Sequence, residues 1–256
     1  MDILKHNREA WNQQVENGNI WTRPVDSQII ENAKKGIWSV VLTPTKPVPL
    51  DWFPKLDGKK VLCLASGGGQ QGPVLAAAGA DVTVFDNSPS QLKRDMEVAK
   101  RDGLSIKIEQ GDMRDLSRFV NESFDLIFHP VSNCFMDDVN KVWKECYRVL
   151  KKDGTLLAGF SNPLTYIFDM NEWDENHKLI VRHRIPYSDL EQLSKEQLEV
   201  KIANKETLEY GHSLQDQIGG QVDAGFMING FYEDSAGGDL LDPYINTFIA
   251  TRAIKK

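Results

Sequence analysis

The fold of this chain is decided by residues 60–86, which read KVLCLASGGGQQGPVLAAAGADVTVFD. The apolar run at 60–64 predicts a buried strand, and the small residues at 71–78 predict a helix that ends at a glycine. A second β-rich run at 81–85 leads into Asp86. A strand, a glycine-rich turn, a helix and a strand in this order are typical of parallel α/β domains that bind a nucleotide at the turn.

The same alternation continues after this stretch. Further strands are predicted over residues 105–109, 124–128, 155–160, 227–232 and 247–253. Helices are predicted over residues 89–101, 139–150 and 213–224. This pattern predicts an α/β fold, doubly wound and Rossmann-like, around a mainly parallel seven-stranded sheet.

Two segments lie outside this alternation. Residues 1–50 hold three tryptophans, among them Trp11 and Trp21, between polar residues and prolines. Because tryptophan is a large apolar body, this arm must pack on something, either covering the main domain or lying over a site as a helical lid. The main domain is then expected to comprise residues 51–161 and 213–256.

Residues 162–212 form the second segment, in which acidic residues outnumber basic ones. Its strand-like run at 179–181 is a candidate to pair with residues 201–202 or 208–210. We therefore expect an antiparallel insertion on the substrate side of the main domain.

The composition narrows the classes of partner. The 256 residues include 30 Lys and Arg against 37 Asp and Glu, a net charge of −7, so no basic excess is present to bind nucleic acid. Cys63, Cys134 and Cys146 have neither disulfide-framework nor metal-ligand spacing. No apolar run approaches the roughly 20 residues of a membrane span, and the first residues lack a signal peptide's apolar core. We expect a cytoplasmic protein without a metal or membrane partner.

The glycine-rich turn carries the strongest chemical signal. Gly67, Gly69 and Gly72 have a nucleotide-binding spacing, in which absent side chains let backbone N–H groups approach a ligand. Asp86 follows Gly67 by 19 residues, where an acid accepts ribose hydroxyls. Two cofactors fit these features: a nicotinamide dinucleotide for hydride transfer, which the glycine spacing favours, and S-adenosylmethionine for methyl transfer.

Asp112 and Met113 favour S-adenosylmethionine. They follow the third predicted strand, where a carboxylate and an apolar side chain can bracket an adenine ring. About 60 residues precede the glycine-rich turn, and the sheet closes with a helix and two strands instead of a separate substrate domain. Both features argue against a dehydrogenase.

Residues 61–69, VLCLASGGG, resemble the first motif of the class I S-adenosylmethionine-dependent methyltransferases with a small-molecule-type core. Cys63 stands where the family often has an acid, and Ala65 stands at its first glycine. The resemblance covers residues 57–160 by motifs and 213–256 by layout. It implies S-adenosylmethionine as cofactor and a sheet whose last strand is antiparallel.

The resemblance also implies a set of site residues. Asp86 would bind the ribose hydroxyls with Asn87 beside the adenine, and Asp112 would accept the adenine amino group with Met113 against the ring. The residues expected to bind the cofactor are Ser66, Gly67, Gly68, Gly69, Asp86, Asn87, Asp112, Met113 and His129.

Methyl transfer from a sulfonium is a displacement on carbon, so the cofactor supplies reactivity and the protein supplies orientation. His129 is the candidate catalytic base, because an ordinary histidine pKa of about 6.5 suits proton removal near neutrality. The alternative is that His129 packs or positions the cofactor. Substrate contacts are expected from the arm and the insertion, with Trp11, Trp21, Tyr166 and His183 as candidates.

These features together predict a cytoplasmic methyltransferase that uses S-adenosylmethionine on a small-molecule acceptor. An NAD(P)-dependent oxidoreductase is the alternative enzyme, and a catalytically silent methyltransferase-like binding protein is the alternative without turnover. The acidic insertion disfavours RNA as acceptor. Neither the acceptor atom nor the oligomeric state follows from the sequence.

Overall fold

Seven strands form one sheet in the computed structural model, which describes residues 1–256. Across the sheet their order is β3-β2-β1-β4-β5-β9-β8. The strands are β1 (Lys60–Leu64), β2 (Asp81–Asp86), β3 (Ile106–Gln110), β4 (Phe124–His129), β5 (Leu150–Ser161), β8 (Phe226–Asp234) and β9 (Phe248–Lys255). Strands β1 to β5 pair in parallel, and β9 is antiparallel to both β5 and β8. The predicted sheet, with its antiparallel last strand, is confirmed.

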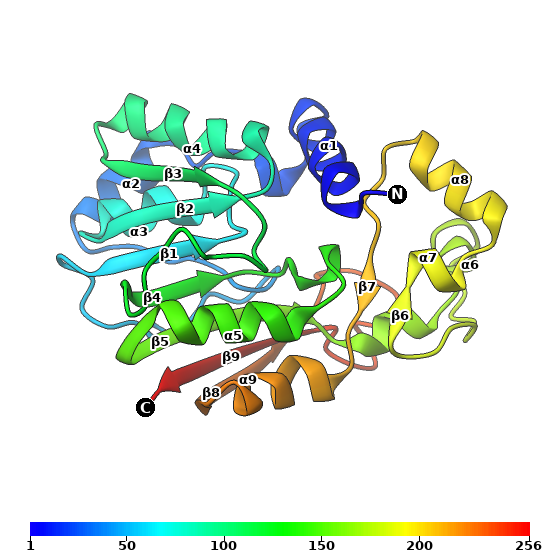
Figure 1. Ribbon diagram of the computed structural model, residues 1–256. Coiled ribbons are helices and arrows are strands. Elements are labelled where there is room, and N and C mark those ends of the chain that lie inside the picture. Colours follow the sequence, from blue (N-terminus) through cyan, green and yellow to red (C-terminus); the bar gives the residue numbers. More distant parts are fainter.

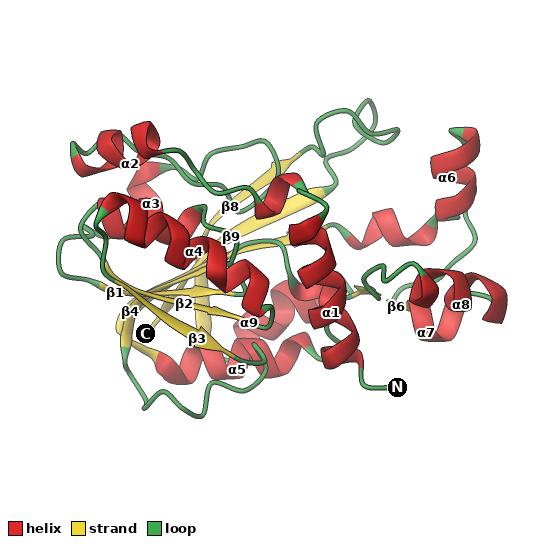
Figure 2. Ribbon diagram, turned by 90° about the horizontal axis from the view of Figure 1, so that it is seen from above, coloured by secondary structure: helices red, strands yellow, loops and turns green.

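Helices cover both faces of the sheet (Figures 1 and 2). The helices are α1 (Ile3–Glu16), α2 (Ser27–Lys34), α3 (Gln71–Ala77), α4 (Pro89–Asp102), α5 (Val139–Val149), α6 (Met170–Asn176), α7 (Asp189–Gln192), α8 (Lys195–Ala203) and α9 (Gly220–Asp223). None of them is long and apolar enough to cross a membrane.

Two hydrophobic cores follow from the alternation of side chains along the strands. Val61 and Cys63 of β1 enter a core that includes residues of α2, α3 and α4, whereas Leu62 and Leu64 enter a second core built with α5. Every one of these four side chains is fully buried. The doubly wound arrangement therefore rests on a central strand that is apolar on both faces.

The helix after β2 forms as its end signals predict. The Ser88 hydroxyl accepts the N–H of Gln91 at the start of α4, Pro89 occupies the first turn, and Gly103 ends the helix in the left-handed conformation. The predicted helix over 213–224 is less regular, because a π-helical turn at Gln215–Gly219 precedes the short α9.

The insertion differs from the expected antiparallel patch. Its only sheet is a two-residue pair, β6 (Tyr187–Ser188) with β7 (Tyr210–Gly211), and helices α6, α7 and α8 make up much of the rest. The prediction for 179–181 was wrong, since it makes only an isolated bridge from Val181 to Phe168. Residues 201–202 belong to α8, which a full capping box between Ser194 and Gln197 starts. The helix signals of that segment thus outweigh its short β-like runs.

The amino-terminal arm packs on the main domain and also borders the space between the sheet and the insertion. Helix α2 buries Ile30 and Ala33 in the core with α3 and α4. Helix α1 packs beside α4 and stands between the sheet and the insertion, which extends away from the sheet to the right in both views (Figures 1 and 2). The space bounded by α1, the carboxyl ends of the parallel strands and the insertion holds the site.

Candidate active site

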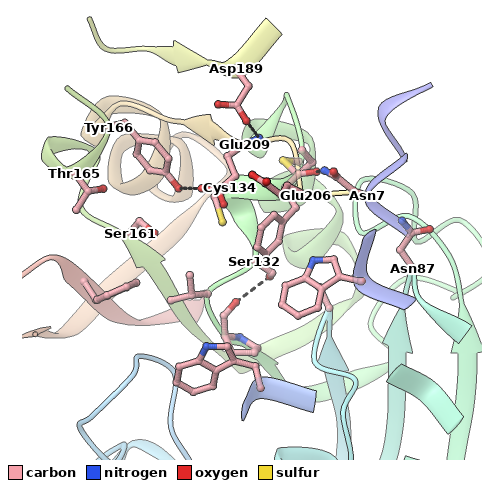
Figure 3. A pocket seen from close by; sticks show the side chains of 18 of the residues that line it. Asn7, Asn87, Ser132, Cys134, Ser161, Thr165, Tyr166, Asp189, Glu206 and Glu209 are labelled. Carbon is pink, nitrogen blue, oxygen red and sulfur yellow. Dashed lines mark hydrogen bonds between the residues drawn. The ribbon is translucent and has the colours of Figure 1, made fainter. Parts of the chain in front are cut away.

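One cavity of about 1020 Å³ lies between the sheet, α1 and the insertion (Figure 3). Residues after the parallel strands form its first wall: Ala65, Ser66, Gly67, Asp86, Asn87, Gly111, Asp112, Met113, Pro130, Val131 and Ser132. The arm and the insertion form much of the opposite wall, including Leu4, Asn7, Trp11, Trp21, Tyr166, Trp173, Tyr187, Asp189, Lys201 and Glu209. Its volume lies at the upper end of the range for ligand pockets, so the cavity has room for a cofactor and a second small molecule.

Two backbone N–H groups of the glycine-rich turn donate hydrogen bonds to carboxyl side chains. The N–H of Gly67 donates to Asp86 Oδ2 at 2.9 Å, and the N–H of Gly68 donates to Asp95 Oδ2 at 3.0 Å. A pyrophosphate-binding turn needs free amides and no adjacent negative charge. The turn is therefore a poor site for a dinucleotide and suits a ligand that carries positive charge.

Two of the three consecutive glycines approach the chain itself rather than the cavity. Gly68 has φ of +121°, and a Cβ there would lie 2.6 Å from the carbonyl oxygen of Trp21. Gly69 has φ of +73°, and its Cβ would lie 2.9 Å from the carbonyl oxygen of Arg94. Neither residue lines the cavity, in contrast to Gly67. The expectation that all three contact the ligand is corrected: Gly68 and Gly69 are small so that the arm and α4 can pack on the turn.

Asp86 ends β2 and faces the cavity. Its Oδ1 accepts the N–H of Ser88 at 2.8 Å, which together with the Gly67 bond fixes the carboxylate in one orientation. Burial raises the pKa of Asp86, while the bonds from Ser88 and Gly67 oppose the rise. A fixed, partly desolvated carboxylate at this position is suited to accept two neighbouring hydroxyls of a ribose.

Asn87 ties the arm to the sheet. Its Nδ2 donates to the carbonyl oxygen of Leu4 at 2.8 Å, and its Oδ1 accepts from Nε of Arg8 at 3.2 Å. Asn87 lines the cavity. Because both of its polar atoms are already engaged with α1, it also positions that helix over the cavity.

Asp112 and Met113 line the same wall. The Asp112 carboxylate is shared with Arg114, whose Nη2 lies 2.6 Å from Oδ2. This contact raises the pKa of the Arg114 guanidinium, so Arg114 is a fixed counterion. Ser66 also lines the cavity, and its hydroxyl lies 3.4 Å from Oε1 of Gln71.

His129 does not reach the cavity, which corrects the expectation for this residue. The ring is fully buried, and it is held between the carbonyl oxygen of Leu64 at Nδ1 (2.9 Å) and Asn133 Oδ1 at Nε2 (2.7 Å). Burial lowers the pKa of His129. Because both nitrogens are engaged and the side chain is enclosed, His129 packs β4 against β1 and has no access to a ligand.

Of the four residues predicted to contact the substrate, three line the cavity and one does not. Trp11, Trp21 and Tyr166 line the cavity. His183 does not: its ring packs edge-on against Tyr187, with 5.1 Å between centroids. His183 lies in the non-helical segment between α6 and β6, outside the cavity.

Several residues that line the cavity are not predicted from the sequence. Asn7 is buried within α1, where its Nδ2 donates to the carbonyl oxygens of Phe135 and Leu208, each at 2.9 Å. Its Oδ1 accepts the N–H of Leu208 at 2.8 Å, so this side chain joins the arm, the core and the insertion. Glu209 follows directly and lines the cavity. A polar residue amid the hydrophobic positions of α1 was the available signal for Asn7, whereas Glu209 carried none.

Two buried polar atoms near the turn lack a partner. They are Oε1 of Gln91, whose side chain lines the cavity, and Oδ1 of Asp95. Asp95 is fully buried behind the turn, and burial raises its pKa to about 8. The cavity wall at Ser66 and Gly67 therefore carries the Asp86 carboxylate together with Gln91, whose amide oxygen is unpaired. This donor and acceptor set fits S-adenosylmethionine, which carries ribose hydroxyls, an ammonium and a sulfonium.

Comparison with known proteins agrees with this geometry. A family model described as a methyltransferase domain matches residues 62–158. The chain is 57% identical over 253 residues to the "Uncharacterized methyltransferase YbaJ" of Bacillus subtilis, covering 99% of this chain and 98% of that protein. It is 33% identical over 101 residues to the sterol 24-C-methyltransferase erg6 of Aspergillus fumigatus, covering 38% of this chain and 26% of that enzyme.

A solved S-adenosylmethionine-dependent methyltransferase from Mesorhizobium loti has the same fold. It superposes with a TM-score of 0.60 at 16% identity, over 80% of this chain and 94% of that one. The alternatives of a nicotinamide-dependent enzyme and of a silent binding protein are set aside. The chain belongs to the class I S-adenosylmethionine-dependent methyltransferases, and S-adenosylmethionine is its cofactor.

Proposed function

We propose that this methyltransferase acts on a small organic molecule that binds between the insertion, α1 and the carboxyl end of β5. The observation that supports this proposal is a single cavity with two differently built walls. Residues at and after the ends of β1, β2 and β3 form one wall, and the other comes mostly from the arm and the insertion. The family resemblance concerns the first wall, so the second wall is the one that selects the acceptor.

On the cofactor side, we assign binding to Ser66, Gly67, Asp86, Asn87, Asp112 and Met113. S-adenosylmethionine supplies a methyl group on a positively charged sulfur that leaves as a neutral thioether. Asp86 is the group for the ribose hydroxyls, since its carboxylate is already oriented by Gly67 and Ser88. The acids around the turn also favour a ligand with net positive charge.

On the acceptor side, the chain itself orients the acceptor and excludes water. Trp11 packs edge-to-face on Phe135, with 5.2 Å between ring centroids, and both rings line the cavity. The Asn7 bonds hold α1 against the insertion. A cavity walled by the arm and the insertion suits a small molecule, and the net charge of −7 also disfavours a nucleic acid as acceptor.

We also infer that the enzyme works in the cytoplasm. The three cysteines, Cys63, Cys134 and Cys146, are all free and buried. Unpaired thiols in every cysteine position are typical of proteins kept in a reducing compartment.

The proposed acceptor class is tested by radiolabelled methyl transfer. A cell extract is separated by ultrafiltration into small molecules and retained macromolecules, and each fraction is incubated with the enzyme and labelled S-adenosylmethionine. We expect label in a new small-molecule product. Label confined to retained protein or nucleic acid would contradict the proposal.

A calorimetric titration tests the assignment of the cofactor wall. S-adenosylhomocysteine should bind the wild-type protein, and Asp86→Ala should weaken that binding. A Tyr166→Phe variant, altered on the opposite wall, serves as the matched control and should retain it. Equal loss in both variants would contradict the division of the cavity into two walls.

A further inference from the structure

The charge of the cavity wall is one-sided. The acidic residues among those that line it are Asp86, Asp112, Asp174, Glu175, Asp189, Glu196, Glu206, Glu209 and Asp239. Lys201 is the only basic residue among them, and neither arginine nor histidine lines the cavity. Seven of the nine acids belong to the arm-and-insertion side or the loop before β9, where the acceptor would bind. An acceptor with a carboxylate or phosphate would find no matching charge there.

Lys201 is not available to such an anion. Its Nζ lies 2.7 Å from Oδ2 of Asp189, whose side chain is 3% exposed. Asp189 also accepts the hydroxyl of Tyr187 at 2.7 Å and the N–H of Glu209 at 2.8 Å. This carboxylate is therefore fully engaged, and it neutralises the lysine.

Glu209 differs from Asp189 in this respect. Its Oε2 accepts the hydroxyl of Tyr166 at 2.9 Å (Figure 3). Its Oε1 has only a long contact of 3.4 Å with the hydroxyl of Thr207. Burial raises the pKa of Glu209, and nearby Lys201 only partly offsets this. A partly buried carboxylate that is short of donors is stabilised by a cation that brings N–H groups.

Aromatic rings lie beside this carboxylate. Tyr166 and Tyr187 stack with 5.5 Å between centroids and an interplanar angle of 24°. Both rings line the cavity. Aromatic surface next to a carboxylate attracts a cation attached to an apolar body.

A second, independent feature of this wall indicates a ligand. The hydroxyl of Thr247 is buried without a hydrogen-bond partner, its residue is 1% exposed, and it lines the cavity. Its backbone oxygen accepts the N–H of Asn162 at 2.8 Å, which places Thr247 beside the residue that follows β5. Asn162 in turn precedes Tyr166 by four positions. A buried hydroxyl costs free energy unless it is paired, so a polar ligand is expected here.

We propose that the acceptor is an organic amine, held as its ammonium ion by Glu209 with its apolar body against Tyr166 and Tyr187. This inference rests on the proposed function. Transfer to nitrogen balances once the ammonium has given up one proton, which passes to Glu209. The nitrogen lone pair then forms the new bond to carbon, and sulfur keeps the electron pair of the bond that breaks.

The test measures binding of three probes that share the 2-phenylethyl group to the protein saturated with S-adenosylhomocysteine. The probes are 2-phenylethylamine, 2-phenylethanol and 3-phenylpropionate. We expect the amine to bind about 10-fold to 100-fold more tightly than the alcohol, and the carboxylate to bind most weakly. Equal or tighter binding of the alcohol or the carboxylate, or no binding of the amine, would overturn the proposal.

Variants assign the effect to the named residue. Glu209→Gln keeps the side-chain shape and should abolish the preference for the amine, while Glu199→Gln removes a charge from exposed α8 outside the cavity and should preserve it. Tyr166→Phe keeps the ring and should weaken amine binding less than Glu209→Gln. Thermal unfolding of each variant detects misfolding, and retained preference in folded Glu209→Gln would refute the assignment. If the wild-type protein does not bind S-adenosylhomocysteine, the assignment of the cofactor site is refuted instead.

Discussion

The two walls of the cavity are built by different physical means. The cofactor wall consists of short turns after parallel strands, where Gly67 follows β1, Asp86 ends the adjacent β2, and the two residues are 19 positions apart. The acceptor wall depends on segments far apart in sequence, such as Asn7 and Leu208, which are 201 residues apart. The first wall is set by local geometry, whereas the second exists only when the whole chain has closed.

The largest effect is expected from Gly68→Ala, because Gly68 lies where the glycine-rich turn of the cofactor wall contacts the amino-terminal arm. An added Cβ would lie 2.6 Å from the Trp21 carbonyl oxygen in a backbone conformation with φ of +121°. We expect a loss of about 3 kcal/mol in unfolding free energy and weaker S-adenosylhomocysteine binding. Gly36→Ala is the control, because Gly36 has φ of +81° and nothing within 4 Å of the new Cβ. Equal destabilisation in denaturant titrations would mean that backbone strain, not contact with the arm, requires glycine at residue 68.

Asp86→Ala should have the next largest effect and should be confined to the cofactor wall. It removes the proposed ribose acceptor and the partner of the Gly67 and Ser88 amides. A hydrogen bond to a charged group contributes about 1.5–3 kcal/mol, which corresponds to roughly 10-fold to 100-fold weaker S-adenosylhomocysteine binding. Calorimetry measures it, and an unchanged affinity would show that the ribose is bound elsewhere.

Asn7→Ala tests the acceptor wall. It leaves the buried carbonyl oxygens of Phe135 and Leu208 without this donor, and we expect about 2 kcal/mol of lost stability. Amide hydrogen exchange at Leu208, whose N–H donates to Asn7, should become faster, and the KM for the acceptor should rise. Glu9→Ala, an exposed change on the same helix, should alter neither quantity. Unaltered exchange at Leu208 in Asn7→Ala would show that the Asn7 hydrogen bonds do not hold the insertion against α1.

Asp95→Asn tests the protonation state of Asp95, behind the cofactor wall, through the pH dependence of stability. Burial is the main reason that the pKa of Asp95 is raised to about 8, and the nearby Asp86 charge adds to it. Between about pH 4 and pH 8 the folded protein then holds a proton that the unfolded chain releases, so the stability from this group falls as pH rises. We expect the unfolding free energy of wild type relative to Asp95→Asn to decrease across this range. A constant difference would contradict a protonated Asp95 at low pH in the folded state.

The smallest effect on chemistry is expected from His129→Gln. The imidazole is enclosed, with both nitrogens bonded, and burial lowers its pKa. The variant should lose about 1 kcal/mol of stability through its hydrogen bonds, while the pH profile of kcat should keep its shape. Disappearance of an ionisation from that profile would restore His129 as a base.

The sequence predicted the sheet and the cofactor wall better than it predicted the insertion. The seven strands and the position of Asp86 could be predicted because hydrophobic periodicity and turn residues are local signals. The antiparallel last strand followed from the family resemblance, since β9 pairs with β5 across a long stretch of the chain. The insertion could not, because short β-like runs such as 179–181 compete with helix signals whose outcome depends on packing. Predictions for side-chain direction were mixed: Tyr166 faces the cavity and His183 does not.

The sequence by itself determined the alternation of strands and helices, the glycine-rich turn and the acid after β2, because periodicity and turn chemistry are local properties. Only the tertiary structure decided which polar groups face the ligand. His129 is closed off by Leu64 and Asn133, while Glu209 reaches the cavity beside Tyr166. The physical reason is that exposure of a side chain depends on every element packed around it, and those elements come from the whole length of the chain.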